Sequence, residues 1–329
     1  MTIVNHVEDL FPGTHRFSHE AMATTFEILI LHQDADYAHQ AAWEAFKEID
    51  RLELQLSRFI ENSDISRINS QAPWQPLKIG LAAFECLQLS TQLSTETGGA
   101  FDANVGFLMD CWLNKDKSAR IPSKEELAAA VVLTGMHLLE LDEAGHTVEL
   151  TSPVSLDFGG VGKGYAVDRV AELLFDWSID TALIHGGASS VLALGSPPGV
   201  DGWPLTMSRP GLNRQVLARV HLKDRALSGS GLEKGQHIID PRTGHPVESI
   251  IAAWASTPKA AVADALSTAF MAMTPESVGN YCSKHPEALV MIVLDGQHGE
   301  GPGDDILRFG PWEQETHLKY IDSTQPNIR

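Results

Sequence analysis

Residues 156–165 have the sequence LDFGGVGKGY, in which four of the six positions from 159 to 164 are glycine. The apolar residues 153–158 predict a short strand entering this turn, and the spacing over 165–175 predicts a helix leaving it. Glycines let backbone amides approach a ligand closely, and the start of a helix offers free N–H groups that suit a phosphate. The segment lacks the Walker A and GxGxxG spacings. Two interpretations of the segment stay open. It binds a phosphate or a metal with the help of Lys163, or it is only a tight turn between a strand and a helix.

The elements expected around this segment mix hairpins with single helices. Apolar spacing predicts helices over 35–57, 81–95, 124–132 and 260–273. Strands are expected over 22–32, 181–185, 190–194, 203–208, 216–222 and 288–294, with a hairpin formed by 137–141 and 147–151. Strands and helices do not alternate regularly, which favours an α+β fold with mixed or antiparallel sheets. We expect an N-terminal extension over 1–19 and one domain over 20–329, with a single core or two lobes that share it.

Composition excludes several classes of protein. The 329 residues carry a formal net charge of −19, which argues against binding to a nucleic-acid backbone. The three cysteines have no CxxC spacing, so they indicate neither a disulfide framework nor a zinc site. No apolar run is long enough to span a bilayer, and the first residues do not resemble a secretory signal. We therefore expect a cytoplasmic protein without a membrane span.

A second candidate motif is the run HIIDPRTG at 237–244. In an extended strand His237 and Ile239 share one face, and Asp240 with Pro241 ends the strand in a turn. A histidine at a strand end can donate to a phosphate or act as a base near neutral pH. The alternative is that His237 only caps the end of the strand and has no role in binding or catalysis.

Just upstream, residues 228–231 have the sequence SGSG. They suggest a second loop of small residues that could face the same ligand, and Ser228 is the candidate binding residue chosen from it. A flexible linker is the alternative.

A third motif is ADALSTA at 263–269, inside a predicted helix. Asp264 and Thr268 are four residues apart and so project from one helix face. A carboxylate and a hydroxyl are oxygen ligands that suit Mg²⁺, and Ser267 could assist or replace Thr268. Alternatively, the threonine bonds back to the helix and Asp264 is placed for the helix dipole.

In this order, these segments resemble the FAD:protein FMN transferase (ApbE-like) family. The resemblance covers residues 20–273. It rests on AMAT (21–24), LSRF (56–59), SDISRIN (63–69), GGAFD (98–102), LDFGGVGKGYAVD (156–168), Gly186-Gly187, HIIDPRTG (237–244) and ADALSTA (263–269).

The resemblance implies an ApbE-like, T-fold-like arrangement of sheets and helices around a flavin-binding cleft. It also implies Mg²⁺-dependent transfer of FMN from FAD to a Ser or Thr of an acceptor protein of redox type, with release of AMP. Carried over, Asp264, Thr268 and the carbonyl of Gly160 would hold the metal, and His237 with Ile239 would close over the nucleotide. By its chemistry, His237 could also take the proton of an incoming hydroxyl and so act as the catalytic base. The residues that the resemblance implies at the FAD site are Met22, Phe59, Ala100, Phe101, Asp102, Asp157, Lys163, His237 and Ile239. We add Ser228, which is expected there from the SGSG segment.

Two other functions stay open. The short stretch between Ser228 and His237 could admit water, which would give a Mg²⁺-dependent FAD pyrophosphatase that releases FMN and AMP. Leu227 and Gly231 stand where relatives usually have a threonine and an aromatic residue, which leaves a non-catalytic flavin-binding protein as the third possibility.

Overall fold

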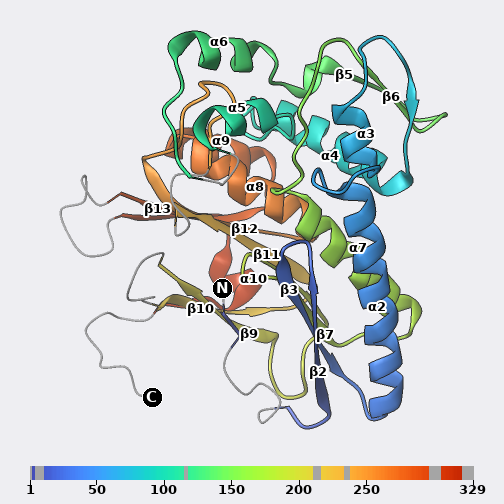
Figure 1. Ribbon diagram of the computed structural model, residues 1–329. Coiled ribbons are helices and arrows are strands. Elements are labelled where there is room, and N and C mark those ends of the chain that lie inside the picture. Colours follow the sequence, from blue (N-terminus) through green and yellow to red (C-terminus); the bar gives the residue numbers. More distant parts are fainter. Residues whose placement is uncertain are drawn as a thin grey trace.

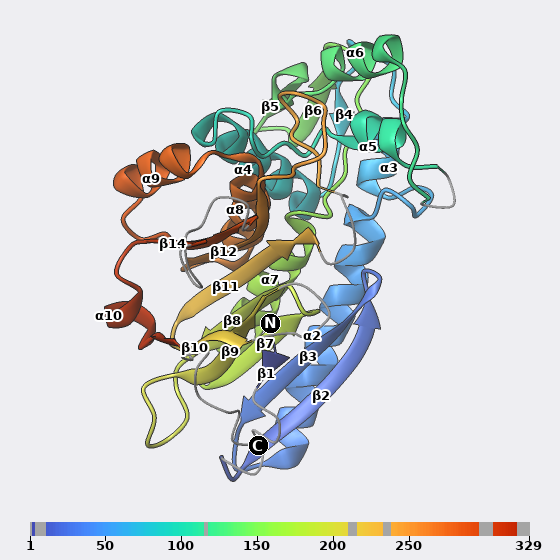
Figure 2. The same cartoon turned by 90° about the vertical axis from the view of Figure 1, so that its left-hand side faces the viewer.

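An eight-stranded sheet forms the centre of the protein (Figures 1 and 2). The computed structural model describes residues 2–3, 11–114, 118–209, 216–232, 238–295 and 305–320. The strand order is β14-β13-β12-β11-β8-β7-β3-β2, and every neighbouring pair is antiparallel. The strands are β2 (Thr14–Ala21), β3 (Thr24–Leu31), β7 (Ala182–Gly186), β8 (Ser190–Leu194), β11 (Arg225–Gly231), β12 (Ile250–Thr257), β13 (Leu289–Leu294) and β14 (Ile306–Phe309).

Helices cover one face of this sheet. On β3, Phe26, Ile28 and Ile30 point into the helical side of the core, because alternate side chains of a strand share one face. Figure 1 shows α2 and α7 running along each other, with α8 beside them and the smaller helices above. The helices are α2 (Ala35–Leu56), α3 (Asp64–Asn69), α4 (Leu81–Glu96), α5 (Gly106–Trp112), α6 (Lys124–Val132), α7 (Gly162–Asp176), α8 (Ala260–Ala272) and α9 (Pro275–Lys284).

A smaller sheet packs on the opposite face. Leu29 of β3 and Leu183 of β7 join Trp203 and Leu205 of the small sheet in a second buried cluster. The small sheet contains β1 (Thr2–Ile3), β9 (Trp203–Ser208), β10 (Val216–Leu222) and β15 (Lys319–Tyr320), with α10 (Trp312–Thr316) nearby. A third sheet joins β4 (Leu77–Lys78), β6 (Thr147–Leu150) and β5 (Leu139–Asp142), which follows a short 3₁₀ turn, η1 (Met136–Leu138).

Most elements expected from the sequence are confirmed, within a few residues at their ends. The five apolar residues that predicted the first helix are all buried on α2: Ala42, Phe46, Ile49, Leu52 and Leu56. Ser123 caps α6, as its hydroxyl accepts a hydrogen bond from the Glu126 N–H at 3.1 Å. The α+β class is confirmed, and the main sheet is wholly antiparallel. None of the described helices combines the length and apolarity needed to cross a membrane.

The strand expected over 153–158 is wrong, since this segment has an irregular conformation. Asparagine side chains replace the partner strand: Asn104 Oδ1 accepts from the Ser155 N–H, and Asn69 bonds both the N–H and the carbonyl of Leu156. The Asp157 N–H donates to the carbonyl of Ala103. An apolar run can therefore be buried without joining a sheet if side chains satisfy its backbone.

The small-residue loop expected at 228–231 is also wrong, because these residues lie in β11 and pair with β12 and, at Ser228, with β8. Glycine is unfavourable in a strand, but here its missing side chain leaves room for a neighbour. A methyl group on Gly229 would stand 2.6 Å from Nε1 of Trp254 on β12.

The N-terminal boundary expected at residue 20 falls inside β2, which pairs with β3 along its whole length. Thr14–Ala21 is an edge strand with several exposed polar residues, so its sequence lacks the apolar enrichment of a central strand.

His185 on β7 makes the stability of the fold depend on pH. It is buried, and its Nε2 atom has no hydrogen-bond partner in the described part of the chain. Burial lowers the pKa of this imidazole from its ordinary 6.5 to about 3. The unfolded chain binds a proton below pH 6.5 and the folded chain does not, so stability is lost as pH falls from 6.5 towards 3.

We expect His185→Leu to reduce this loss by about 1.4 kcal/mol per pH unit between pH 6 and 5. Urea denaturation of both proteins at several pH values measures the difference in slope. Equal slopes for the wild type and the variant would contradict the assignment.

Candidate active site

The aspartate and threonine of α8 lie beside the glycine turn at the start of α7. Asp264 is only 3% exposed, and its Oδ2 atom accepts a hydrogen bond from the Gly164 N–H at 3.1 Å, across 100 positions of sequence. Its Oδ1 atom accepts from the Ser190 hydroxyl of β8 at 3.0 Å. One helical turn further on, Thr268 faces the same bend: a methyl group on Gly160 would stand 3.4 Å from Thr268 Oγ1. The carboxylate, the hydroxyl and the glycine backbone therefore meet.

Two residues of α7 bring α8 this close. A methyl group on Gly164 would stand 2.3 Å from the carbonyl oxygen of Ala260, so only glycine permits the approach. The Asp168 carboxylate accepts from the N–H groups of Ala260 and Ala261 at 2.7 and 2.9 Å, and so caps α8. The motif GKGYAVD thus joins the glycine turn to the helix that carries Asp264.

Lys163 is the cation nearest to the buried carboxylate among the ion pairs of the described residues. Its Nζ atom lies 3.5 Å from Asp264 Oδ2 and donates to the Gly159 carbonyl at 2.8 Å. Its side chain is about one-fifth exposed, so the ammonium group also has access to solvent. A lysine in this position can compensate the Asp264 charge or bind an incoming phosphate.

The donor atoms fit a hard divalent cation. Asp264 and Thr268 supply a carboxylate and a hydroxyl, and the backbone of Gly160 adjoins them. No cluster of three or more His, Cys, Asp or Glu residues suited to a metal occurs in the described ranges. A site with few protein ligands, all oxygen, matches Mg²⁺, which keeps several positions for water or substrate phosphate.

A partly exposed group of residues lies next to the glycine turn: Arg58, Phe59 and Asp157. Arg58 Nη1 lies 3.2 Å from Asp157 Oδ2, and Asp157 Oδ1 accepts from the Gly159 N–H at 2.7 Å. Phe59 is 80% exposed, and the Arg58 guanidinium lies 5.7 Å from its ring centre. An exposed aromatic ring beside a cation is available to stack on a planar ligand.

Met22 lies in the tight turn between β2 and β3. Met22 and Ala23 have φ values of +50° and +57°, which non-glycine residues adopt at a cost. The turn between β7 and β8 packs closely against the turn between β2 and β3, since a methyl group on Gly187 would stand 2.3 Å from Thr24 Oγ1. A methyl group on Gly186 would stand 3.5 Å from the Lys163 carbonyl oxygen. Both turns therefore lie at the end of the sheet where α7 begins.

Ala100, Phe101 and Asp102 are all buried, and Phe101 is adjacent to the glycine turn. A methyl group on Gly160 would stand 3.3 Å from Phe101 Cε2. The Asp102 carboxylate accepts from the N–H groups of Asn104 and Met136 at 2.7 and 3.1 Å. Burial raises the pKa of this carboxyl group, and the two hydrogen bonds oppose that rise.

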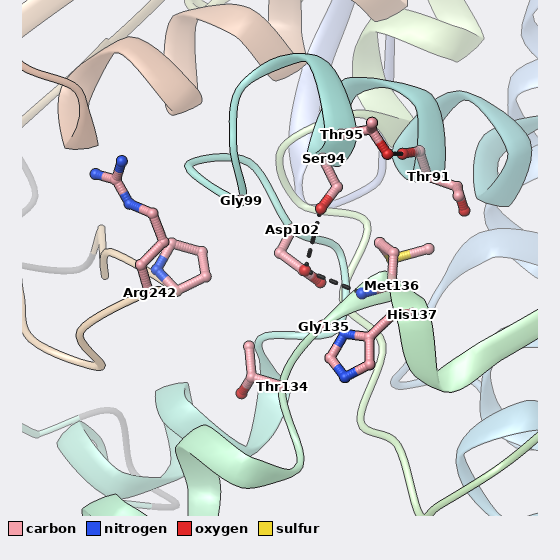
Figure 3. A pocket seen from close by; sticks show the side chains of 11 residues that line it. Thr91, Ser94, Thr95, Gly99, Asp102, Thr134, Gly135, Met136, His137 and Arg242 are labelled. Carbon is pink, nitrogen blue, oxygen red and sulfur yellow. Dashed lines mark hydrogen bonds between the residues drawn. The ribbon is translucent and has the colours of Figure 1, made fainter. Parts of the chain in front are cut away.

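Asp102 also borders a cavity of about 310 Å³ (Figure 3). In Figure 3 the Asp102 carboxylate lies between Ser94 of α4 and the Met136 backbone, with His137 nearby and Arg242 across the opening. Its lining is rich in hydroxyl groups and is formed by Thr91, Ser94, Thr95, Gly99, Asp102, Thr134, Gly135, Met136, His137, Pro241 and Arg242. Most of the exposed lining is apolar, and the hydroxyl groups of Thr91, Thr95 and Thr134 donate to backbone carbonyls.

Three expected site residues are placed differently or not at all. The side chain of Ile239 packs against Leu108, Cys111 and Ala130 in a small apolar cluster. Ser228 is fully buried, and its Oγ has no hydrogen-bond partner among the described residues. His237 lies outside the described residues.

The turn expected after Ile239 is confirmed. The Gly244 N–H donates to the Asp240 carbonyl at 2.8 Å, and Gly244 has a φ of +74°. Arg242 projects from this turn and donates to the Ala272 carbonyl at the end of α8. The turn is thereby attached to the helix that carries Asp264.

Two serines at the site were not expected individually: Ser190, and Ser230 of the SGSG segment, from which Ser228 was expected instead. Ser190 bonds Asp264 directly, and Ser230 of β11 lies 3.2 Å from Thr268 Oγ1. Single serines carry no recognisable pattern, although Ser190 follows the Gly186-Gly187 turn by three residues and Ser230 belongs to the SGSG segment.

The fold and the site together define an α+β protein whose glycine turn, helix N-terminus and buried oxygen cluster suit a phosphate-bearing ligand with a divalent cation. The family comparison agrees with this class. The ApbE family model matches residues 22–293, and the chain belongs to this family. The resemblance inferred from the motifs is therefore confirmed.

Individual relatives cover most of the chain. The FAD:protein FMN transferase of Chlamydia muridarum is 30% identical over 249 residues, which cover 70% of this chain and 76% of the relative. The protein of the same name from Salmonella typhimurium is 26% identical over 306 residues, covering 87% and 86%. The crystal structure of the Pseudomonas stutzeri flavinyl transferase ApbE in its apo form superposes with a TM-score of 0.80 at 24% identity, covering 92% of this chain and 96% of that one. This last likeness confirms the fold.

Proposed function

We propose that this chain transfers the FMN part of FAD to a serine or threonine hydroxyl of an acceptor protein and releases AMP, with Mg²⁺ as the required cation. The observation that carries the proposal is the meeting of Asp264 and Thr268 with the Gly160 turn. Family membership and the names of the relatives support the same reaction.

In the proposed reaction the acceptor oxygen bonds to the phosphorus of the FMN part. The bridging P–O bond of the diphosphate breaks, and AMP leaves with the electron pair of that bond. Asp264, Thr268 and the Gly160 carbonyl would hold the cation, which offsets the negative charge that develops on the phosphates. The proton of the acceptor hydroxyl goes to a base, a role we assign to His237 on the ground of its motif.

The remaining residues are proposed to bind the dinucleotide. Phe59 and Met22 would contact a planar ring, and Lys163 would bind the diphosphate. Ala100, Phe101 and Asp102 would line the nucleotide site beside the cavity of Figure 3. Asp157 would hold the glycine turn and Arg58 in place through the contacts described above.

The test is incubation of the protein with FAD in the presence and absence of Mg²⁺, with and without a whole-cell protein extract as the source of acceptor. We expect AMP by chromatography and a flavin fluorescence that stays on a protein band after denaturation, both only with Mg²⁺. Free FMN with AMP, formed without extract and with no labelled band, would indicate the pyrophosphatase. Bound flavin without any AMP would indicate a binding protein.

Lys163→Met is expected to weaken FAD binding about tenfold, because it removes the charge proposed to bind the diphosphate. The affinity for Mn²⁺ without FAD should not fall, since the variant also removes a cation that lies 3.5 Å from Asp264. Quenching of flavin fluorescence measures the first quantity and Mn²⁺ titration the second. Lys47→Met on the exposed side of α2 is the control, and equal FAD affinity in both variants would refute the role of Lys163.

A further inference from the structure

Three hydroxyl groups from two elements meet beside the proposed cation site. Ser230 lies on β11, and Ser267 and Thr268 are neighbours on α8. The Ser230 Oγ atom lies 2.9 Å from Ser267 Oγ and 3.2 Å from Thr268 Oγ1. Ser230 therefore contacts the hydroxyl that we propose as a metal ligand, as well as the fully buried serine next to it.

The direction of the hydrogen bond between Ser230 and Ser267 follows from a backbone carbonyl. A carbonyl oxygen can only accept, so the Ser267 hydroxyl, 2.9 Å from the Asp264 carbonyl, donates its proton there. Ser267 Oγ can then accept the proton of Ser230, which leaves the lone pairs of Ser230 Oγ free to accept the proton of Thr268 at 3.2 Å. The Asp264 carbonyl oxygen has a second lone pair and lies 3.3 Å from Thr268 Oγ1, so it competes with Ser230 for the Thr268 proton.

We propose that Ser230 is a positioning residue that takes the proton of Thr268 and so turns the lone pairs of Oγ1 towards Gly160 and the cation. A neutral hydroxyl binds a cation only through its lone pairs, so its proton must have an acceptor elsewhere. The inference rests on the proposed function, because it presumes that Thr268 is a metal ligand.

The experiment is titration of the full-length protein with Mn²⁺ alone, with free Mn²⁺ followed by electron paramagnetic resonance. We expect Ser230→Ala to weaken Mn²⁺ binding about tenfold, as is usual when the partner of a metal ligand is removed. Ser230→Thr keeps the hydroxyl and should restore most of the affinity. In the FAD assay, Ser230→Ala should raise the Mg²⁺ concentration needed for half-maximal rate, with kcat at saturating Mg²⁺ within about threefold of the wild type.

The chain of hydroxyls also predicts non-additivity. Ser267→Ala removes the acceptor of the Ser230 proton. The double variant Ser230→Ala/Ser267→Ala should therefore have the same Mn²⁺ affinity as each single variant. Ser90→Ala is the matched control, because Ser90 on α4 is fully buried and its Oγ has no partner among the described residues. It should leave Mn²⁺ binding unchanged.

The outcomes separate this inference from the proposed metal site. If Asp264→Asn weakens Mn²⁺ binding but Ser230→Ala does not, the role of Ser230 is refuted and the metal site stands. If Asp264→Asn leaves Mn²⁺ binding unchanged, the metal site is refuted, and the role of Ser230 fails with it. Full additivity of Ser230→Ala and Ser267→Ala would also overturn the proton order derived above.

Discussion

Asp264→Asn is expected to lower the initial rate of AMP release from FAD about a thousandfold at fixed Mg²⁺. Asparagine has nearly the same shape and its side-chain oxygen still accepts from the Ser190 hydroxyl, which lies 3.0 Å from Oδ1 in the wild type. The negative charge, however, is lost, and with it most of the attraction for a divalent cation. Chromatographic measurement of AMP over time gives the rate.

A lower rate of Asp264→Asn could result from unfolding as well as from loss of the cation, so the stability of the variant must be measured separately. Asp264 is almost fully buried, and removal of its charge also leaves Lys163 without that counter-ion. We expect the urea midpoint of Asp264→Asn to fall, because Oδ2 accepts from the Gly164 N–H in the wild type and an amide NH₂ group in its place would face that donor. Circular dichroism at the assay temperature therefore checks that the variant is folded before its rate is compared. Asp176→Asn at the exposed end of α7 is the control and should retain full activity. An Asp264→Asn protein that keeps more than a tenth of the wild-type rate would refute the assignment of this carboxylate.

Gly164→Ala is expected to lower the free energy of unfolding by about 3 kcal/mol, the upper end of the usual cost of overpacking. The added methyl group would stand 2.3 Å from the carbonyl oxygen of Ala260 and 2.8 Å from the Cα of Ala261, both backbone atoms that cannot rotate away. Helix α8 must therefore move off α7. Because α8 carries Asp264 and Thr268, Mn²⁺ binding should weaken as well. Urea denaturation and Mn²⁺ titration measure the two effects.

The matched control for Gly164→Ala is Gly162→Ala, two residues earlier on α7. A methyl group on Gly162 would meet its nearest neighbour, Phe158 Cβ, at 3.5 Å, which is an ordinary contact. Alanine also favours a helix over glycine, so Gly162→Ala should be neutral or slightly stabilising. Equal destabilisation by both substitutions would show that the α7–α8 contact is not the cause.

Helices were predictable because their signal is local. The apolar residues of α2 recur every three or four positions, and that spacing alone decides which side of the helix is buried. The same periodicity placed Asp264 and Thr268 on one face of α8, which is what the structure has. Turn chemistry was equally local at Asp240 and Gly244.

Elements stabilised by distant partners were not predictable in this way. Ser228 and Gly229 resemble a loop in sequence, yet β12 and β8 on either side make them part of a central strand. Residues 153–158 resemble a strand, yet Asn69 and Asn104 satisfy their backbone groups. In both cases a partner far along the chain decides the conformation, and the local sequence does not indicate which partner that is.

The chemical groups of the site can be read from the order of residues alone: a glycine turn, a lysine, and an aspartate and a threonine one helical turn apart. They can be read in this way because side-chain chemistry and helical periodicity are properties of neighbouring residues. That these groups meet, and that Ser190 and Ser230 join them from two strands, follows from the folded arrangement of distant elements. Helices α7 and α8 bring the groups together because they pack closely, through the missing side chain at Gly164 and the cap provided by Asp168.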